Sequence, residues 1–384
     1  MVTATRAPYA IICGGYVNAY SIAQSLKAIG WEGSIVCLKD AATPALVDIR
    51  KDVETWNDPL SSPVDVIRLI STRLPAEASK IVFLTDERFH EALRDGIRSG
   101  SLHNTRLFLG AANCLETILD RYEFCRFIET RQLGSVPKTI GSDVDPWATF
   151  VNRFFLRFKR SWRGIEKLPR VRPVSDKKTF KKIVTGLRDQ GYREEEWCYQ
   201  EILSTSPRHN VSISGWHSAD HQTYLATRKV LQHPAETGNG DVCELIETPP
   251  GLAKTTERLL TTLGYEGPFE LEFVLDTKAD QYKMIELNPR FWMQHGLIGA
   301  ATGQELICRY IGRTPGSPPP LPPKYWVNSV YAMFRLMRLD LRICRYIYSS
   351  STLLVPSWSE TFKWLPLLAS KKFRSHLPRR TGRK

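Results

Sequence analysis

The clearest alternation of apolar and polar positions in the chain lies between Gly264 and His295. In residues 268–275, Glu270 and Glu272 fall on one side and apolar residues fall on the other, which is the pattern of a half-buried strand. A polar turn at 276–280 then allows the chain to reverse direction. The pattern predicts a β-hairpin with one acidic face.

The second strand of this hairpin continues the alternation. Met284, Glu286 and Asn288 fall on one face, and Ile285 and Leu287 fall on the other. Folding the hairpin would gather oxygen-bearing side chains from both strands, with a cation just beyond them. These residues are Glu272, Glu286, Asn288 and Arg290.

This side-chain set indicates a metal site. Two carboxylates and an amide oxygen suit a hard cation such as Mg²⁺ when phosphate oxygens complete its shell. The alternative is a solvated acidic face on an edge hairpin, because isolated charged side chains are mostly exposed. The E-L-N-P-R run at 286–290, with an acidic strand before it, favours the metal site.

Strand and helix patterns alternate in the N-terminal third of the chain. Residues 9–40 predict a strand, a Gly14-Gly15 turn, a helix and a second strand, and a similar unit spans 81–110. Such units form parallel sheets with a ligand crevice at the carboxyl ends of the strands. The glycines do not form a dinucleotide-binding fingerprint, so we expect only a small open α/β domain.

A basic strand is predicted in the next part of the chain. After an amphipathic helix at 116–131, the run 154–164 alternates aromatic and basic side chains, with Arg157 and Lys159 on one face. Such a run suits phosphate contact, but it also suits a solvated basic face, and the residues alone leave both open. A helix ending near residue 190 follows.

Residues 191–313 predict a second mixed region. A strand at 197–203 is expected to pair with one at 211–216, and a meander continues from residue 221. A helix at 252–263 then precedes the acidic hairpin.

The C-terminal part begins with a proline-rich run at 315–323, which predicts a stiff extended linker. Beyond it, arginines recur at spacings of three and four, which predicts one basic stripe along a helix. The stripe consists of Arg335, Arg338, Arg342 and Arg345. Such a helix, with nearby tryptophans and a basic end at 379–384, either lies on an anionic membrane or packs its apolar face on the protein.

Composition narrows the range of partners. The chain has 384 residues and a net charge of +13, which calls for an anionic partner such as nucleotide phosphates, acidic substrates or a membrane surface. Zinc-finger spacing and aromatic RNA-binding motifs are absent from the sequence, so we exclude nucleic acid. Eight cysteines without a C-x-x-C pair predict reduced thiols in a cytoplasmic protein.

Residues 9–313 resemble the ATP-grasp superfamily, particularly its carboxylate–amine ligases and the related ATP-dependent carboligases. The strongest motif pairs F-E-L-E-F at 269–273 with I-E-L-N-P-R at 285–290. The run L-D-R-Y-E-F at 119–124, followed by V-P-K-T at 136–139, resembles the start of the ATP-binding region in that superfamily.

The resemblance also implies roles for individual residues. Mg²⁺ bridging the ATP phosphates would be held by Glu272, Glu286 and Asn288. Arg290 would stabilise charge on the transferred γ-phosphoryl group. Adenine and ribose would be held by a hinge strand with four contacting residues. These are Gln200, Glu201, Ile202 and Leu203.

Two positions depart from the superfamily pattern. Its phosphate-contacting lysine is best matched by Lys159, with Arg157 in an assisting position, but Arg160 stands where a proline is usual. Arg121 stands where the superfamily has a lysine. These departures bear on the ATP phosphate contacts and leave the hairpin motif intact.

The implied function is an ATP-dependent ligase that joins a small-molecule carboxylate to an amine through an acyl-phosphate intermediate, forming a carbon–nitrogen bond. A kinase or another ligase could use the same ATP site. From a different class, a non-catalytic nucleotide-binding or membrane-docking module with a decayed site remains an alternative. The basic tail adds peripheral contact at the inner face of the membrane to the expected cytoplasmic location.

The expected fold is ATP-grasp-like and combines α/β and α+β parts, with two subdomains clasping ATP. We expect an open parallel N-terminal domain and, after the ATP-binding region, a linker with a tail. The predicted divisions are 1–115 for the N-terminal domain, 116–190 and 191–313 for the two subdomains, and 314–384 for the linker and tail.

Overall fold

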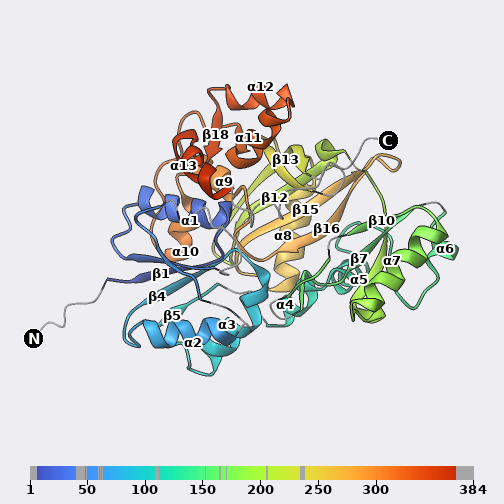
Figure 1. Ribbon diagram of the computed structural model, residues 1–384, viewed down its shortest axis with the longest axis horizontal. Helices are drawn as coiled ribbons and strands as arrows, with labels where there is room; N and C mark the ends of the chain where they lie inside the picture. The colour runs from blue at the N-terminus through green and yellow to red at the C-terminus, as the bar shows by residue number, and fades with distance from the viewer. Residues whose placement is uncertain are drawn as a thin grey trace, which may run out of the picture.

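The computed structural model of the protein contains three main sheets arranged side by side (Figure 1). It describes residues 7–39, 48, 50–58, 60, 62, 64–108, 112–151, 153–163, 166–169, 171–204, 206–233 and 238–368. Within these residues, no helix is both long enough and apolar enough to cross a membrane.

The N-terminal sheet is fully parallel, with strand order β3-β2-β1-β4-β5. Helix α1 packs on one face of it, and helices α2 and α3 pack on the other, because the apolar side chains of each strand alternate between the two faces. The predicted open parallel α/β domain is therefore confirmed. Its elements are β1 (Tyr9–Cys13), α1 (Val17–Ala28), β2 (Ser34–Leu38), β3 (Glu54–Trp56), α2 (Val64–Arg73), β4 (Lys80–Leu84), α3 (His90–Arg98) and β5 (Thr105–Arg106).

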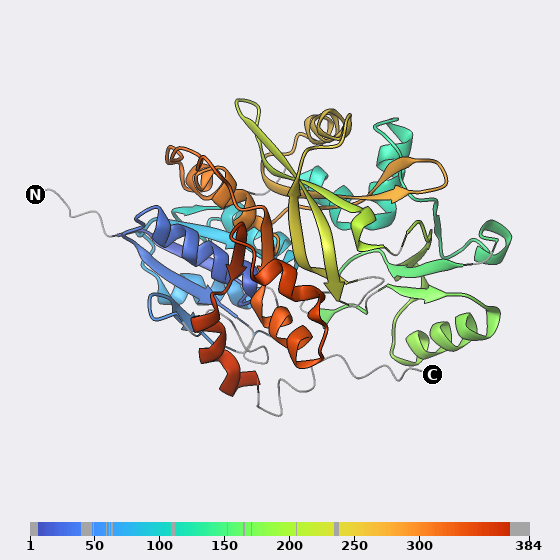
Figure 2. The same cartoon turned by 90° about the horizontal axis from the view of Figure 1, so that it is seen from above.

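A small antiparallel sheet of order β10-β7-β11-β6 forms the second body, which Figure 2 shows projecting to one side of the large sheet. Its apolar side chains pack against helix α7. The predicted basic strand ends at Phe158, so Lys159 lies in the turn beyond it, and Gly164 lies outside the described residues. The elements are β6 (Thr139–Gly141), α6 (Pro146–Thr149), β7 (Phe154–Phe158), the ribbon β8 (Trp162–Arg163) with β9 (Glu166–Lys167), β10 (Arg172–Val174), α7 (Lys177–Asp189) and β11 (Trp197–Glu201).

The largest sheet has seven strands in the order β16-β15-β12-β13-β14-β17-β18. Helices α4, α5 and α8 cover one face, and α9 and α10 contribute to a core shared with the N-terminal domain on the other side. The elements are α4 (Ala112–Leu119), α5 (Arg121–Thr130), β12 (Asn210–His217), β13 (Gln222–His233), β14 (Asn239–Ile246), α8 (Leu252–Leu263), β15 (Gly267–Asp276), β16 (Gln281–Asn288), α9 (His295–Ala301), α10 (Glu305–Ile311), β17 (Tyr325–Asn328) and β18 (Thr352–Val355).

The helix predicted at 116–131 is in fact two helices that meet at Asp120. The Asp120 carboxylate accepts hydrogen bonds from the backbone N–H groups of Tyr122 and Glu123, and it thereby starts α5 as an N-cap. Both helices pack on the large sheet, so the predicted first subdomain, 116–190, is divided between two bodies.

The predicted acidic hairpin is present, but the facing of its second strand was partly wrong. Glu272 pairs with Glu286 and Phe273 pairs with Met284, so Ile285 is an extra residue in a β-bulge. The bulge turns Met284 into the core beside Leu287. The acidic face itself keeps its predicted composition.

The C-terminal part is not a separate linker and tail. β17 pairs with β14, and β18 adds parallel to β17, so residues 325–328 and 352–355 complete the large sheet. The predicted arginine helix is also wrong as a single element, because α11 (Ser329–Met337) ends at a left-handed Leu339 with φ 56°. Two short helical turns, η5 (Leu341–Ile343) and α12 (Cys344–Ile347), and the helix α13 (Trp358–Leu368) follow it. The basic end at 379–384 lies outside the described residues.

A buried ion pair ties this C-terminal layer to the large sheet. Arg335 of α11 donates to the carboxylate of Asp241 in β14, and its Nη2 also donates to the backbone oxygen of Gln232 at 2.9 Å. Arg335 is thus not part of an exposed stripe. Burial raises the pKa of Asp241 to about 6, against the opposing effect of the Arg335 charge.

We expect Arg335→Leu to destabilise the protein by about 3–5 kcal/mol at pH 7, because it leaves the Asp241 carboxylate buried without its charge partner. Urea unfolding measures this change. The matched control is Arg345→Gln, which removes an exposed arginine of the same layer and should change stability by less than about 0.5 kcal/mol. A loss of similar size in both variants would contradict the assignment.

Candidate functional site

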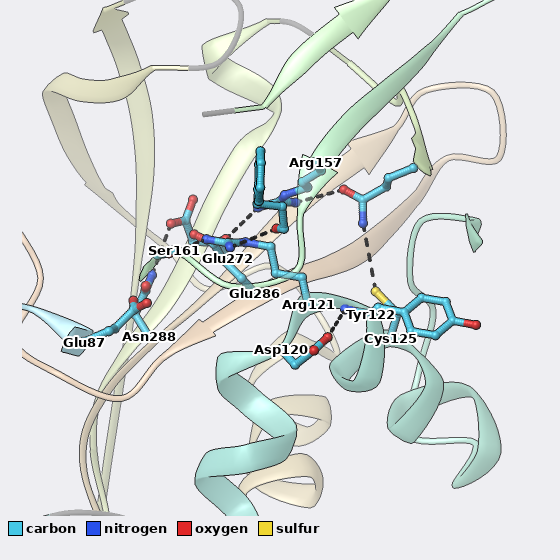
Figure 3. Close-up of polar contacts among 12 residues, drawn as sticks. Glu87, Asp120, Arg121, Tyr122, Cys125, Arg157, Ser161, Glu272, Glu286 and Asn288 are labelled. Carbon is cyan, nitrogen blue, oxygen red and sulfur yellow. Dashed lines mark hydrogen bonds and ion pairs between the residues drawn. The ribbon is translucent and has the colours of Figure 1, made fainter. Parts of the chain in front are cut away.

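Two arginines from separate elements converge on Glu286 (Figure 3). Arg121, the first residue of α5, donates from Nε to Oε2 of Glu286 at 2.9 Å. Arg157, from β7, donates from Nη2 to the same oxygen at 2.6 Å. Because β7 belongs to the small sheet, whereas α5 packs on the large sheet that contains β16, the contact of Arg157 joins the small sheet to the large one.

The local fold explains why Arg157 reaches this position. Phe154, Leu156 and Phe158 are buried in the small-sheet core, so Arg157 points from the opposite face of β7 toward the large sheet. Its Nη1 also donates to Gln200 Oε1 at 2.8 Å on the neighbouring strand β11.

Electrostatics keep Glu286 ionised. Burial alone would raise the pKa of Glu286, but the charges of Arg121 and Arg157 outweigh that effect and lower the pKa to about 2. The side chain is 22% exposed, so it borders an opening rather than the core. Burial and the neighbouring Arg121 lower the pKa of Arg157 from its ordinary value, yet an arginine remains charged at neutral pH.

The second carboxylate of the predicted metal set has its own cation. Lys229 of β13 donates from Nζ to Glu272 Oε2 at 2.8 Å. The Lys229 ammonium is buried, but Glu272 and Glu270 hold its pKa above the ordinary value. Glu272 therefore faces the same space as Glu286, its register partner in β16.

The amide of Asn288 is held in one orientation. Its Nδ2 donates to Glu270 Oε2 at 3.1 Å and to Glu272 Oε1 at 3.3 Å. Its Oδ1 accepts from Arg290 Nη2 at 3.1 Å. The carboxylates thus fix the NH₂ group, and the amide oxygen is left on the side of Arg290.

Arg290 links the hairpin to the N-terminal domain. Its Nε donates to Glu87 Oε1 at 3.2 Å, just before α3. Burial opposes the charge of Arg290, but Glu87 and Glu270 together raise its pKa above the ordinary value. The predicted catalytic arginine therefore lies where the N-terminal domain meets the metal set.

The residues present fit a Mg²⁺ ion that is shared with a phosphate ligand. Glu272 and Glu286 are adjacent across the hairpin and supply the hard oxygen donors that Mg²⁺ prefers, and the Asn288 oxygen would join them if the amide turned away from Arg290. The described residues contain no group of three or more His, Cys, Asp and Glu side chains that could hold a metal alone. Further oxygens would have to come from a ligand, and the surrounding cations suit phosphates.

A cavity of about 170 Å³ lies between the two sheets and brings most of the predicted site together. Three of the four predicted hinge residues line it, and Ile202 is not among its lining residues. The predicted residues in its wall are Arg157, Gln200, Glu201, Leu203, Glu272 and Glu286.

Lys159 lies apart from this cavity. Its ammonium sits over the Tyr122 ring, 5.0 Å from the centroid. It borders a different cavity of about 580 Å³, together with Arg160 and Trp162. Arg160 pairs there with Glu91 and Glu116. Of the two predicted phosphate contacts, the structure thus places only Arg157 beside the carboxylates.

Several residues of this site were not among the predicted site residues. Lys229 and Gln232 line the cavity from β13, and Glu270 orients Asn288. The sequence placed Lys229 in a predicted meander of strands. Whether its side chain points into the cavity depends on the register between β13 and its neighbours, which the sequence pattern does not give. Arg121 was noticed only as a departure from a motif, and its contact with Glu286 spans 165 residues.

Comparison with known proteins identifies the fold class. Residues 247–315 match the family described as carbamoyl-phosphate synthase L chain, ATP binding domain. This segment contains α8, the acidic hairpin, α9 and α10. A search of the curated proteins finds no match.

Three solved structures are similar to this chain. The ADP complex of N5-carboxyaminoimidazole ribonucleotide synthetase has a TM-score of 0.64 at 14% identity, covering 88% of this chain and 86% of that one. L-amino acid ligase from Bacillus licheniformis has a TM-score of 0.58 at 14% identity, covering 81% and 75%. Pyruvate carboxylase from Rhizobium etli has a TM-score of 0.60 at 14% identity over 80% of this chain.

This chain spans only 28% of the length of that pyruvate carboxylase chain. The family match and the structural similarities agree, and together they confirm the resemblance drawn from the sequence motifs. The chain therefore has the fold of these solved structures, and the family match falls on the segment that carries the acidic hairpin.

We expect the ion pairs of Glu286 to make stability depend on pH. The pKa of Glu286 is lower in the folded protein than its ordinary value of 4.5, so its stabilising contribution is complete above about pH 4.5 and is lost as the pH falls toward 2. The difference in the free energy of unfolding between the wild type and Glu286→Gln should therefore shrink over that range. Urea unfolding at a series of pH values measures it.

The matched control for this experiment is Glu129→Gln, which changes an exposed glutamate of α5. A wild-type to Glu286→Gln difference that stays constant from pH 5 to pH 2.5 would contradict the depressed pKa.

Proposed function

We propose that the protein is an ATP-dependent ligase that joins a carboxylate to an amine through an acyl-phosphate intermediate. The observation that carries this proposal is the Glu272–Glu286 pair, which is held by three cations, with a fourth bound to the neighbouring Asn288, at the junction of the sheets. Paired carboxylates suit a metal, and cations around them suit a polyphosphate. The cations are Arg121, Arg157, Lys229 and Arg290.

In this proposal, ATP occupies the cavity between the small and large sheets. Gln200, Glu201 and Leu203 would hold adenine and ribose, and Arg121 and Arg157 would transfer their hydrogen bonds from Glu286 to phosphate oxygens. Mg²⁺ would be held by Glu272, Glu286 and Asn288, and when bound it neutralises charge on the phosphates. The arginines are already oriented, so little side-chain entropy is lost on binding.

The proposed reaction has two steps. A substrate carboxylate oxygen attacks the γ-phosphorus, the bond to the β-phosphate oxygen breaks, and ADP leaves with an acyl phosphate formed. The amine nitrogen then attacks the acyl carbon, loses a proton and displaces inorganic phosphate. Arg290 would stabilise the charge on the transferred group, since positioning and electrostatics supply most of the catalysis in phosphoryl transfer.

The similar structures support the class of substrate. One is an L-amino acid ligase, and another is an N5-carboxyaminoimidazole ribonucleotide synthetase. We therefore propose small-molecule carboxylate and amine substrates, without nucleic acid, and a cytoplasmic location.

A non-catalytic nucleotide-binding module is the second candidate. It is favoured by the pairing of both proposed metal-binding carboxylates with cations, which a catalytic site must release for Mg²⁺ to bind. In such a module ATP would bind without turnover. The two candidates differ in ADP and phosphate release.

We expect ADP release that depends on both a carboxylate and an amine, measured across pools of amino acids and carboxylates. Glu286→Gln should lower this rate by about 100-fold or more, because it removes a carboxylate that would hold Mg²⁺ against the phosphates. Glu129→Gln, at an exposed position of α5, is the matched control and should keep wild-type activity. ATP binding without turnover in any pool would favour the non-catalytic module.

Substitution of the two predicted phosphate contacts should separate their roles. Arg157→Gln is expected to weaken ATP binding by about 10- to 100-fold, because a charge-assisted hydrogen bond to phosphate is worth about 1.5–3 kcal/mol. Lys159→Gln should change the Kd by less than about threefold, since Lys159 lies outside the cavity. Calorimetric titration with ATP and Mg²⁺ measures both. A larger effect for Lys159→Gln would move the phosphate site to the other cavity.

A further inference from the structure

The C-terminal layer exposes an unusual concentration of large apolar side chains between residues 337 and 348. Met337 is 61% exposed, Leu339 82%, Leu341 65% and Tyr348 82%. They are four of the nine exposed large apolar residues in the described part of the chain. We call residues 337–348 the C-terminal turn surface. Soluble proteins rarely gather exposed apolar residues in this way unless the surface meets a partner.

The backbone holds these side chains outward. α11 ends in a tight turn in which the N–H of Asp340 donates to the backbone oxygen of Arg335 at 2.9 Å. Leu339 occupies the left-handed position of this turn, φ 56°, where glycine is usual and a branched side chain is disfavoured. Beneath the turn, Ile343 and Tyr346 are buried. The exposed leucines are therefore displayed by an anchored turn.

Cations surround the exposed apolar residues. Residues 329–359 contain four arginines and one acidic residue, Asp340, which gives a net charge of +3. Asp340 is paired with Arg335 and Arg342. The arginines on the outside of this layer are Arg338, Arg342 and Arg345. In this surface, apolar tips and positive charges occur together.

The chain beyond the described residues adds to this charge. Residues 369–384 contain seven lysines and arginines and no acidic residue. They follow α13, which packs on α11 through a hydrogen bond between Ser329 and Thr361 at 2.6 Å. The basic end of the chain thus starts from the layer that carries the C-terminal turn surface.

We propose that the C-terminal turn surface docks on an anionic lipid surface. Leu339, Leu341 and their apolar neighbours enter the boundary between headgroups and acyl chains, and the arginines contact lipid phosphates. A lipid surface fits better than a protein groove, because the exposed apolar residues alternate with charged ones, Arg338, Asp340 and Arg342, and the net charge of the surface is positive. Figure 1 places α12 at the outer edge of the molecule, and the surface lines no part of the cavity at Glu286.

Docking of this kind leaves the ATP-grasp site open to its ligands and does not depend on the proposed ligase activity. The C-terminal turn surface also differs from the predicted arginine stripe. Arg335 points into the protein, and the proposed lipid contact is made by the turn after α11 rather than by one face of a helix. The apolar tips supply insertion, and the arginines supply preference for negative charge.

The test is co-sedimentation of the full-length protein with vesicles of phosphatidylcholine, with and without phosphatidylserine. We expect binding only to vesicles that contain phosphatidylserine, and weaker binding as salt increases. The double variant Leu339→Ser with Leu341→Ser should bind at least about tenfold more weakly than the wild type, because two inserted apolar side chains are lost. Arg345→Gln should weaken binding by about fivefold.

Matched controls come from exposed apolar residues elsewhere. Val151 is 94% exposed and Leu321 is 89% exposed, and Val151→Ser with Leu321→Ser should leave vesicle binding unchanged. Thermal unfolding of each variant checks that the fold is intact. An equal loss in the control and in the Leu339/Leu341 variant would overturn the proposal.

A final variant separates the surface from the chain end. Changing the seven lysines and arginines of residues 369–384 to glutamine should weaken binding but leave a preference for phosphatidylserine, because Arg338, Arg342 and Arg345 remain. The proposal is overturned if the wild type does not bind anionic vesicles. It is also overturned if the glutamine variant loses all binding while the Leu339/Leu341 variant binds like the wild type.

Discussion

The contact of Arg121 and Arg157 with one oxygen of Glu286 is the constraint on which the arrangement of the sheets depends. Each arginine comes from a different body, and Glu286 lies on the edge strand of the large sheet. Removing these three charged groups from water costs free energy, and the hydrogen bonds and opposite charges that they share offset this cost. The same contacts keep the carboxylate ionised and the guanidinium groups oriented. The cleft between the small and large sheets is thus held together by the groups that we propose to bind its ligands.

This constraint connects stability with function. Both proposed metal-binding carboxylates are paired with cations of the protein. Binding of Mg²⁺ and phosphates would therefore replace existing ion pairs with new ones, and would not have to order solvent-exposed side chains. Asn288 is already fixed between two carboxylates and Arg290. Electrostatic preorganisation of this kind lowers the cost of stabilising transferred charge. A second buried ion pair, Asp241–Arg335, likewise joins the C-terminal layer to the large sheet.

Local patterns predicted much of this fold. Alternation along 268–288 was sufficient for the hairpin and for the Glu272–Glu286 pair, because strand side chains alternate regardless of the partner. The bulge at Ile285 was not predictable, since an extra residue appears only when the register with β15 is known. Lys159 was assigned to a strand that ends one residue earlier. Likewise, β17 became a sheet strand because β14 offered an edge for pairing, which no local pattern reveals.

The most direct measurement of the central claim is a crystal structure with a non-hydrolysable ATP analogue and Mg²⁺. We expect the metal about 2.0–2.1 Å from oxygens of Glu272 and Glu286, with Arg121 and Arg157 moved from Glu286 onto phosphate oxygens. Phosphates bound instead beside Lys159 in the larger cavity, with both arginines still on Glu286, would contradict it.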